Sequence, residues 1–135
     1  MTTSTPVYAA RSLIAAGTSN SAGGTTEGTP LDLRGKFGGM LTAKITNGAT
    51  GPTTQATIQV LVAVADGATP SAGAEGTNWK LIYEIGGGVD ANAVTRIRGV
   101  PVYGAQHLHV RVTGNTGQSV TCEAFMTEFS SVSSA

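Results

Sequence analysis

An alternation of apolar and polar residues with a period of two restricts the fold of this chain more than any other feature. Residues 106–129 contain two such runs, separated by a glycine-bounded loop at residues 114–117. Because successive side chains of a strand point to opposite faces, each run predicts a half-buried strand. Gly117 suits the positive φ of a hairpin loop, so we expect the two runs to pair as a hairpin. This register places Leu108 opposite Ala124, Val110 opposite Cys122 and Val112 opposite Val120.

The same period recurs in much of the remaining chain. Apolar positions alternate in residues 41–45, 57–66 and 79–85, and shorter strands are expected at residues 31–33 and 93–102. Residues 57–66 are apolar on both faces, which predicts a strand that is central in its sheet or covered outside by a neighbouring subunit. The 19 Gly and five Pro divide the chain as turns divide short strands. We therefore predict an all-β protein, an antiparallel β-sandwich of jelly-roll type with about eight strands.

The first 30 residues differ in composition from the remainder. Residues 7–16 hold the only plausible short helix, although Leu13 and Ile14 could equally enter a strand, and residues 17–30 resemble a mobile loop. A chain of 135 residues is long enough for one core. We expect a flexible N-terminal arm and mobile loop over residues 1–30, a β-sandwich domain over 31–130 and a polar tail over 131–135.

The charge balance argues against several classes of partner. Eight basic and eight acidic residues cancel, and the basic residues are spread from Arg11 to Arg111. Nucleic-acid binding needs clustered Lys and Arg, so we predict neither a local basic patch nor a nucleic-acid partner. No apolar run reaches the ~18 residues of a membrane span, and the residues after Met1 do not resemble a secretory signal, so no membrane partner is expected. A net charge near zero favours association with other subunits.

The single cysteine, Cys122, falls on an inward face of its predicted strand. It has no second cysteine with which to form an internal disulfide, and we expect it to be a small buried hydrophobe. Stability must then come from packing or from partner subunits.

Two histidines raise the possibility of a metal site. His107 and His109 project from the same face, and the hairpin register sets His109 opposite Glu123, with Arg111 diagonal to that carboxylate. Two imidazoles and a carboxylate could hold Zn²⁺ or Fe²⁺. The alternative is an exposed polar face on which these charges pair across the ladder. We favour the alternative, and predict no metal and no cofactor.

The set of reactive side chains argues against an enzyme. The chain has two histidines, no G-x-S-x-G elbow, and a lone cysteine in an inward position. Three glycines at residues 86–88 follow a predicted strand, but neither a phosphate-binding Lys nor G-x-G-x-x-G spacing accompanies them. We therefore predict no catalytic residues and no small-molecule substrate.

The aromatic residues offer two candidate contacts. Trp79 and Tyr83 share a face with Leu81 in the predicted strand, which favours a place in the core over a platform for a sugar ring. Phe125 and Phe129 instead fall on the nominally outer face of the last strand. Either a bulge re-phases that strand, or these two rings are buried against another subunit.

Three stretches carry a resemblance to a known class of proteins. They are LDLRGKFGGMLTAKITNGATGPTTQATIQVLVA, EGTNWKLI and VPVYGAQHLHVRVTGNTGQSVTCEA, which together cover about residues 31–129. In these stretches the chain resembles the decoration or cement proteins of tailed-bacteriophage capsids. The resemblance implies a jelly roll or related sandwich, a homotrimer, and a flexible terminal segment. It also implies a protein made in the host cytoplasm that clamps adjacent major capsid subunits on the outside of the virion.

Two other functions remain open at this point. One is a carbohydrate- or receptor-binding module of a phage head fibre or tail, and the other is a head–tail connector component. Glycan binding distinguishes the first of these, and the copy number per virion distinguishes the second.

Overall fold

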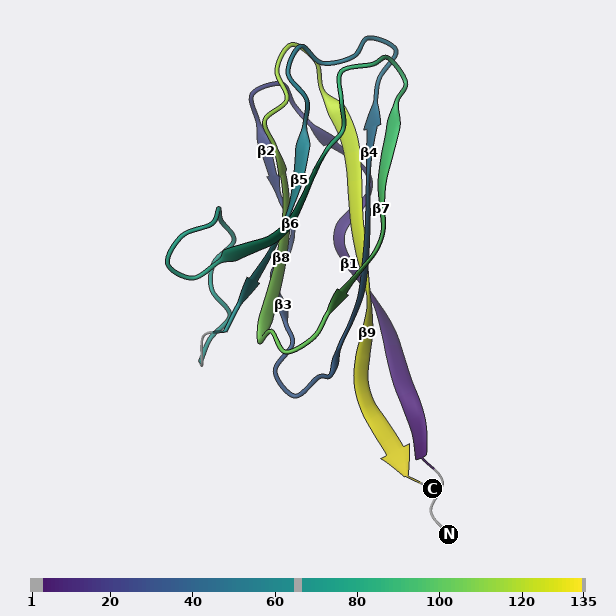
Figure 1. Ribbon diagram of the computed structural model, residues 1–135, viewed down its shortest axis with the longest axis vertical. Helices are drawn as coiled ribbons and strands as arrows, with labels where there is room; N and C mark the ends of the chain where they lie inside the picture. The colour runs from purple at the N-terminus through teal and green to yellow at the C-terminus, as the bar shows by residue number, and fades with distance from the viewer. Residues whose placement is uncertain (1–3, 65–66, 135) are drawn as a thin grey trace.

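The computed structural model describes residues 4–64 and 67–134, with side chains described for residues 6–64 and 67–130. This part of the chain is all-β, and none of its segments is a helix that could cross a membrane. Its nine strands form two antiparallel sheets that face each other (Figure 1). The strands are β1 (Ser4–Asn20), β2 (Thr25–Glu27), β3 (Leu31–Asp32), β4 (Gly38–Asn47), β5 (Thr57–Ala63), β6 (Lys80–Gly86), β7 (Val94–Val102), β8 (His107–Thr113) and β9 (Val120–Ser134).

The strand order is that of a jelly roll. The sheet that we call sheet A has the order β1-β9-β4-β7, and sheet B has the order β2-β8-β5-β6, with β3 also paired to β8. The first strand pairs with the last, and strands progressively closer to the middle of the sequence pair with each other in the same way. The pairs are β1 with β9, β2 and β3 with β8, β4 with β7, and β5 with β6. A long antiparallel ribbon wrapped into two sheets has this connectivity. The predicted antiparallel β-sandwich of jelly-roll type is confirmed.

The predicted hairpin between the two runs of residues 106–129 is wrong. β8 lies in sheet B beside β5, and β9 lies in sheet A between β1 and β4, so residues 114–119 cross from one sheet to the other. The inward faces are nevertheless as predicted, because the apolar residues of β8 and those of β9 are buried from opposite sides of one core. The period of a strand specifies which face is buried, and it does not specify which strand lies alongside.

The main core fills the space between the sheets. Cys122 is buried there as predicted, and burial raises the pKa of its thiol, so the thiol stays protonated and inert. Fully burying one aliphatic side chain contributes about 1.5–3 kcal/mol. The large side chains with the smallest exposed fractions in this core are Leu41, Ile45 and Met126 from sheet A, and Ile58, Val60, Leu108, Val110 and Val112 from sheet B.

The N-terminal segment differs from the predicted arm. β1 is a strand of sheet A along its whole length, and Leu13 and Ile14 are buried in the core, so within the described residues there is neither a short helix nor a free arm. The register with β9 shifts between Ser12 and Ile14, and again between Ile14 and Thr18. These irregularities break the period of two, which is why the alternation does not reveal the strand. Residues 1–3 lie outside the described part of the chain.

The ends of β1 and β9 continue together below the sandwich as a two-stranded ribbon (Figure 1). In this ribbon Ser4 lies opposite Ser134, and Tyr8 lies opposite Phe129. The predicted polar tail is therefore part of a paired strand as far as Ser134, and Ala135 is not described. We refer to this projection as the terminal ribbon.

At the end of the sandwich away from the terminal ribbon, buried asparagine side chains form hydrogen bonds with the loops that connect the strands. The Asn115 side chain donates hydrogen bonds to the carbonyl oxygens of Gln118 (2.9 Å) and Asn20 (3.1 Å), and accepts one from the Asn20 amide. Asn47 similarly donates to the carbonyl oxygen of Asp90 (2.9 Å) in the loop before β7. These bonds give backbone carbonyls a partner where the chain leaves its sheets.

Candidate interaction surface

Both histidines lie on the outer side of sheet B, yet they are not surface groups. The side chains of His107 and His109 are fully buried. The Nε2 atom of His109 lies 2.7 Å from a carboxylate oxygen of Glu27 in β2, and Arg111 donates two hydrogen bonds to the other oxygen of that carboxylate (2.8 and 3.0 Å). The outer face of sheet B therefore carries a compact polar network.

The predicted grouping of His107, His109 and Glu123 does not occur. Glu123 is in sheet A, where it pairs with Lys44 at 3.0 Å, because β8 and β9 are not neighbours. The alternative of an exposed polar face is wrong as well, since both histidines are buried. Across the described residues, no group of three or more His, Cys, Asp and Glu side chains could hold a metal ion. No sequence spacing could have indicated Glu27 as the partner of His109, because the two are 82 residues apart.

Burial and hydrogen bonding act against each other in this network. Partial burial raises the pKa of Glu27, but the hydrogen bonds from Arg111 and His109 outweigh it, so the pKa of this carboxyl lies below its usual value. For His109 desolvation prevails over the hydrogen bond to Glu27, and the pKa of the imidazole is lowered. At neutral pH, Glu27 is thus a carboxylate and His109 is neutral. This is the arrangement of a structural polar group.

Trp79 closes the outer face of sheet B. Its side chain is buried, its ring centroid lies 5.3 Å from that of His109, and its Nε1 donates a hydrogen bond to the carbonyl oxygen of Ser71 (2.8 Å). With Leu61, Ala63 and Leu81 it forms a second apolar cluster, separate from the main core. β5 lies between β8 and β6 in sheet B, and its outer residues Leu61 and Ala63 are covered by the Trp79 side chain of the same chain.

A bulge separates Trp79 from Tyr83. β6 has one residue more than β5 where Val60 pairs with Tyr83 and Leu61 with Leu81, so the two halves of β6 present opposite faces. Trp79 is buried as predicted, but outside the main core, and Tyr83 is 40% exposed at the edge of the sheet. The two rings do not share a face and cannot form a joint platform for a sugar.

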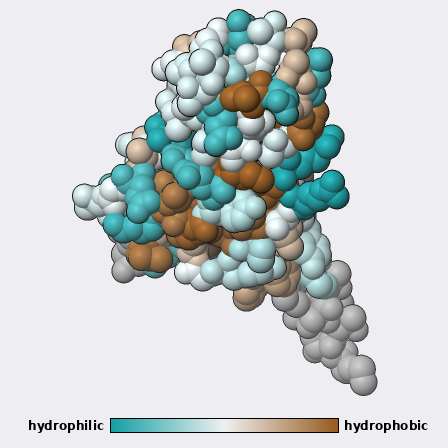
Figure 2. Space-filling view, turned by 45° about the horizontal axis from the view of Figure 1, so that its top comes forward, coloured by the Kyte–Doolittle hydropathy of each residue, from teal (hydrophilic) through white to brown (hydrophobic). Residues whose placement is uncertain are grey.

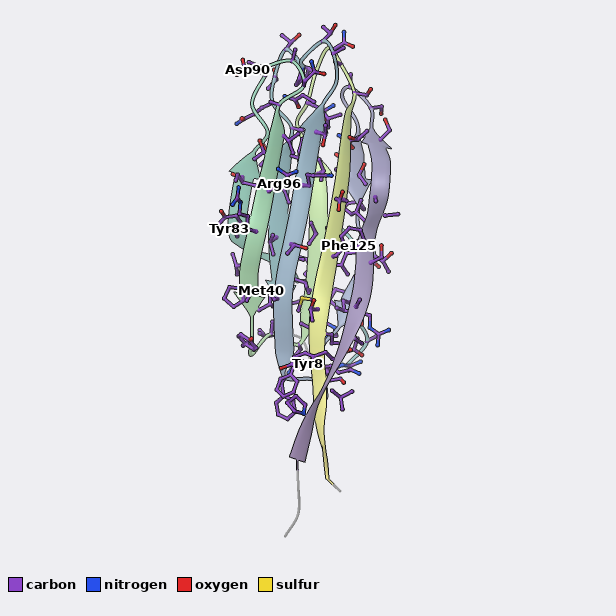
Figure 3. The ribbon with its side chains drawn as sticks, turned by 90° about the vertical axis from the view of Figure 1, so that its right-hand side faces the viewer. Tyr8, Met40, Tyr83, Asp90, Arg96 and Phe125 are labelled. Atoms are coloured by element: carbon purple, nitrogen blue, oxygen red, sulfur yellow. The ribbon has the colours of Figure 1, made fainter. Side chains whose placement is uncertain are left out.

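Sheet A has an uncovered outer face, seen in Figure 3. β9 pairs with β4 in continuous register from Phe129 to Val120, so no bulge in this ladder re-phases the rings of Phe125 and Phe129. That alternative is wrong, and both rings are on the outer face, each only partly buried. Met40 of β4 is 42% exposed on the same face. No described segment of the chain crosses over it.

Three rings stack at the base of this face, next to the terminal ribbon. Phe129 contacts Tyr8 with ring centroids 5.3 Å apart and Phe37 with centroids 4.8 Å apart. Tyr8 remains 63% exposed and Phe37 54% exposed. We call Tyr8, Phe37 and Phe129 the aromatic cluster.

A buried carboxylate anchors the strand that carries this cluster. Glu128 is 1% exposed and forms ion pairs with Arg11 of β1 (3.3 Å) and with Lys36 of the loop before β4 (3.5 Å). Three segments are thereby tied together where the terminal ribbon leaves the sandwich. Glu128 alternates in phase with the inward apolar positions of β9, so the presence of a carboxylate at an inward position was the signal that could have singled it out.

The fold also brings together positively charged side chains that are distant in sequence. A shallow hollow of about 480 Å³ on the outer face of sheet A is lined by Lys44, Arg96 and Arg98, together with Thr42 and Glu123. The prediction that scattered basic residues form no local patch is wrong, because β4 and β7 are adjacent in the sheet. We call this site the basic hollow.

A further apolar area lies along β6 and β7, the edge strands of the two sheets. Figure 2 shows hydrophobic side chains reaching the surface in patches on this side. A groove of about 270 Å³ here is lined by Val64, Ile82 and Tyr103, which are 71%, 47% and 62% exposed. The molecule therefore exposes large apolar groups in two separate regions.

Comparisons with known proteins find solved structures of similar fold but no relative by sequence. No protein-family model and no curated protein matches the sequence. The crystal structure of PirA is similar, with a TM-score of 0.53 and 13% identity over 87% of this chain and 92% of that chain. A chain from the structure of infectious bursal disease virus Gx strain has a TM-score of 0.53 and 10% identity, covering 91% of this chain and 32% of that chain. The SPBc2 prophage-derived protein YomS has a TM-score of 0.45 and 18% identity, covering 91% and 95%.

At such low identities the likeness concerns the fold alone. The chain has a β-sandwich fold that is also found in a protein of a virus.

Proposed function

We propose that this chain is a structural virion protein that binds the outside of a bacteriophage capsid and stabilises it by bridging adjacent major capsid subunits. The observation that carries the proposal is the uncovered outer face of sheet A, with its aromatic cluster. Tyr8 and Phe37 expose more than half of their surface there. Exposed aromatic rings of this kind are typical of the residues that contribute most to protein–protein binding.

The shape of the molecule supports bridging. The sandwich presents a broad face, and the terminal ribbon extends beyond it (Figure 1). A stiff body with a projection can touch one subunit with its face and a second subunit with the ribbon. Binding of this kind stabilises an assembled shell by mass action, because the protein binds the intact shell and not the separated subunits.

The proposal includes the assembly state and location. We expect a homotrimer, made in the host cytoplasm and placed on the capsid exterior, with no catalytic activity, cofactor, nucleic acid or small-molecule substrate. A second exposed apolar area along β6 and β7 suits a protein with more than one kind of neighbour.

The test uses phage heads prepared without this protein. Adding the purified full-length chain should raise the temperature, or the chelator concentration, at which the heads lose their DNA. Saturation at hundreds of copies per head supports capsid decoration, whereas a ring of about a dozen copies identifies a connector component. Heads whose resistance is the same with and without bound protein would overturn the stabilising role.

The rival role in carbohydrate recognition has lost its original basis. Trp79 is buried against His109 and hydrogen-bonded to Ser71, so it is not available to stack on a sugar. Its fluorescence should already be blue-shifted in the free protein and should not respond to glycans. A glycan array with specific hits would favour receptor binding over decoration.

A further inference from the structure

The basic hollow has a defined construction. Arg96 of β7 lies opposite Lys44 of β4. The next residues of β7 form a bulge, since Ile97 pairs with Ala43 but Val100 pairs with Leu41. Arg96 and Arg98 are two residues apart in β7 and therefore project from the same face into the same hollow, with the buried Ile97 between them.

The hollow carries an excess of positive charge. Lys44 is paired with Glu123 at 3.0 Å, so these two charges offset each other. Arg96 and Arg98 are exposed and make no ion pair or hydrogen bond with any group in the described part of the chain. Two guanidinium groups are therefore available on one side of an otherwise uncovered sheet. Figure 3 shows Arg96 on this face, with Phe125 and Met40 farther down.

Apolar groups adjoin these cations. Phe125 lies opposite Thr42, which lines the hollow, and Met40 packs over Gly99, where an added Cβ would come within 2.9 Å of the Met40 sulfur. The face thus combines an apolar centre with a positively charged border. Protein interfaces have this composition, with an apolar core, enrichment in Met and Arg, and a polar rim.

We propose that the basic hollow is the docking site for an acidic segment of the partner protein, with its Asp or Glu carboxylates received by Arg96 and Arg98. The inference rests on the proposed function in taking that partner to be the major capsid subunit. A guanidinium group matches a carboxylate with two parallel hydrogen bonds, which gives orientation as well as attraction. Charge complementarity here fixes which way the sandwich lies on the shell.

Nucleic acid is a less suitable occupant. Duplex binding depends on many cations that neutralise successive phosphates, whereas this hollow offers two unpaired ones beside the carboxylate of Glu123. The adjoining Phe125 and Met40 suit an apolar protein surface better than a phosphate backbone. An acidic protein segment therefore fits the whole face, and a nucleic acid fits only part of it.

The experiment compares two charge-reversed forms of the full-length protein. Arg96→Glu/Arg98→Glu removes the excess positive charge, and Arg34→Glu/Lys80→Glu makes the same change of net charge outside the hollow. Binding to purified heads is measured by co-sedimentation at low and at physiological salt. We expect the first variant to bind at least about tenfold more weakly and the control to bind within about twofold of the original chain. The affinity of the original chain should fall with added salt.

The outcomes separate this inference from the proposed function. If the original chain binds heads and Arg96→Glu/Arg98→Glu binds equally well, the docking site is refuted while decoration stands. If the original chain does not bind heads at all, the proposed function fails. A gel-shift assay with duplex DNA forms a third arm, and binding there that depends on Arg96 and Arg98 would overturn the inference in favour of nucleic acid. Should the charge-reversed variant fail to fold by circular dichroism, Arg96→Gln/Arg98→Gln replaces it.

Discussion

The two outer faces of the sandwich are built from similar alternating strands but are completed in different ways. On sheet B the segment 67–79 folds back, and Trp79 seals His109 and Leu61 from water. On sheet A the described chain provides no such cover, and Tyr8 and Met40 remain 63% and 42% exposed. One face is thus completed within the subunit, and under the proposed function a partner completes the other. Four changes test this contrast.

The largest effect is expected from removing the cover of sheet B. Trp79→Ala should lower the free energy of unfolding by about 3–5 kcal/mol, because it leaves a cavity over Leu61 and exposes a buried imidazole. Urea unfolding followed by circular dichroism measures this. The control is Tyr83→Ala in β6, the strand that follows Trp79; this side chain is 40% exposed, and its loss should cost about 1 kcal/mol or less. Equal losses for both variants would contradict the assignment of the cover to Trp79.

On sheet A, removing an aromatic ring should affect binding more than folding. Tyr8→Ala should change the free energy of unfolding by about 1 kcal/mol or less, because the ring is largely exposed. Its binding to phage heads should weaken by about 2 kcal/mol, the loss typical of an aromatic residue that contributes strongly to an interface. Co-sedimentation with heads and urea unfolding give the two numbers. A variant that binds normally would show that the aromatic cluster is not a contact.

The polar network of sheet B should make stability depend on pH. Burial lowers the pKa of His109 in the folded state, although the hydrogen bond to Glu27 opposes this. In the unfolded state the imidazole has a pKa of about 6.5, so below this pH the unfolded state binds more protons than the folded state. Stability is therefore complete above that pH and falls as the pH drops toward the folded-state pKa, by at most about 1.4 kcal/mol per pH unit. The pKa of Glu27 is also lowered, so its contribution is present above pH 4.5 and is lost on further acidification.

Urea unfolding at pH 7.5 and pH 5.5 measures the slope. The matched variant His109→Asn keeps a polar group without the titration and should flatten the slope over this interval. A slope that the substitution leaves unchanged would assign the pH dependence to another group.

The smallest effect is expected at an ion pair of the open face. Lys44 and Glu123 are 37% and 21% exposed, and solvent screens their attraction. Lys44→Ala should change the free energy of unfolding by about 0.5 kcal/mol or less. A loss comparable to that of Trp79→Ala would mean that the outer face of sheet A contributes to folding as much as the covered face does.

The sequence alone was enough to predict which face of most strands is buried, and to predict the class of fold. Leu41, Ile45, Ile58 and Cys122 are buried as their alternation predicts, because a strand with one face against a core must repeat every two residues. The strand expected at residues 93–102 is also present, and as β7 it lies at the edge of sheet A, where Pro101 is tolerated although it cannot donate a hydrogen bond.

What the sequence did not reveal depends on which strands are neighbours. His109 meets Glu27 instead of Glu123, and Arg96 meets Lys44, only because of a strand order that local patterns do not encode. The split of β6 between two faces has a similar origin, because a single extra residue in the bulge exchanges the sides of Trp79 and Tyr83. Groups of residues that are assembled across strands, such as those of the basic hollow, are therefore visible only in the folded molecule.

The pairing of β1 with β9 also has a consequence for the order of folding. β1 has β9 as its only partner strand within the described chain, and the pair joins Ser4 to Ser134. β9 is synthesised after all the other described strands, so sheet A cannot be completed until β9 has emerged from the ribosome. Pairings between such distant segments close slowly. A chain cut short within β9 would leave β1 without its partner strand, so the sandwich can close only after its first and last described strands have met.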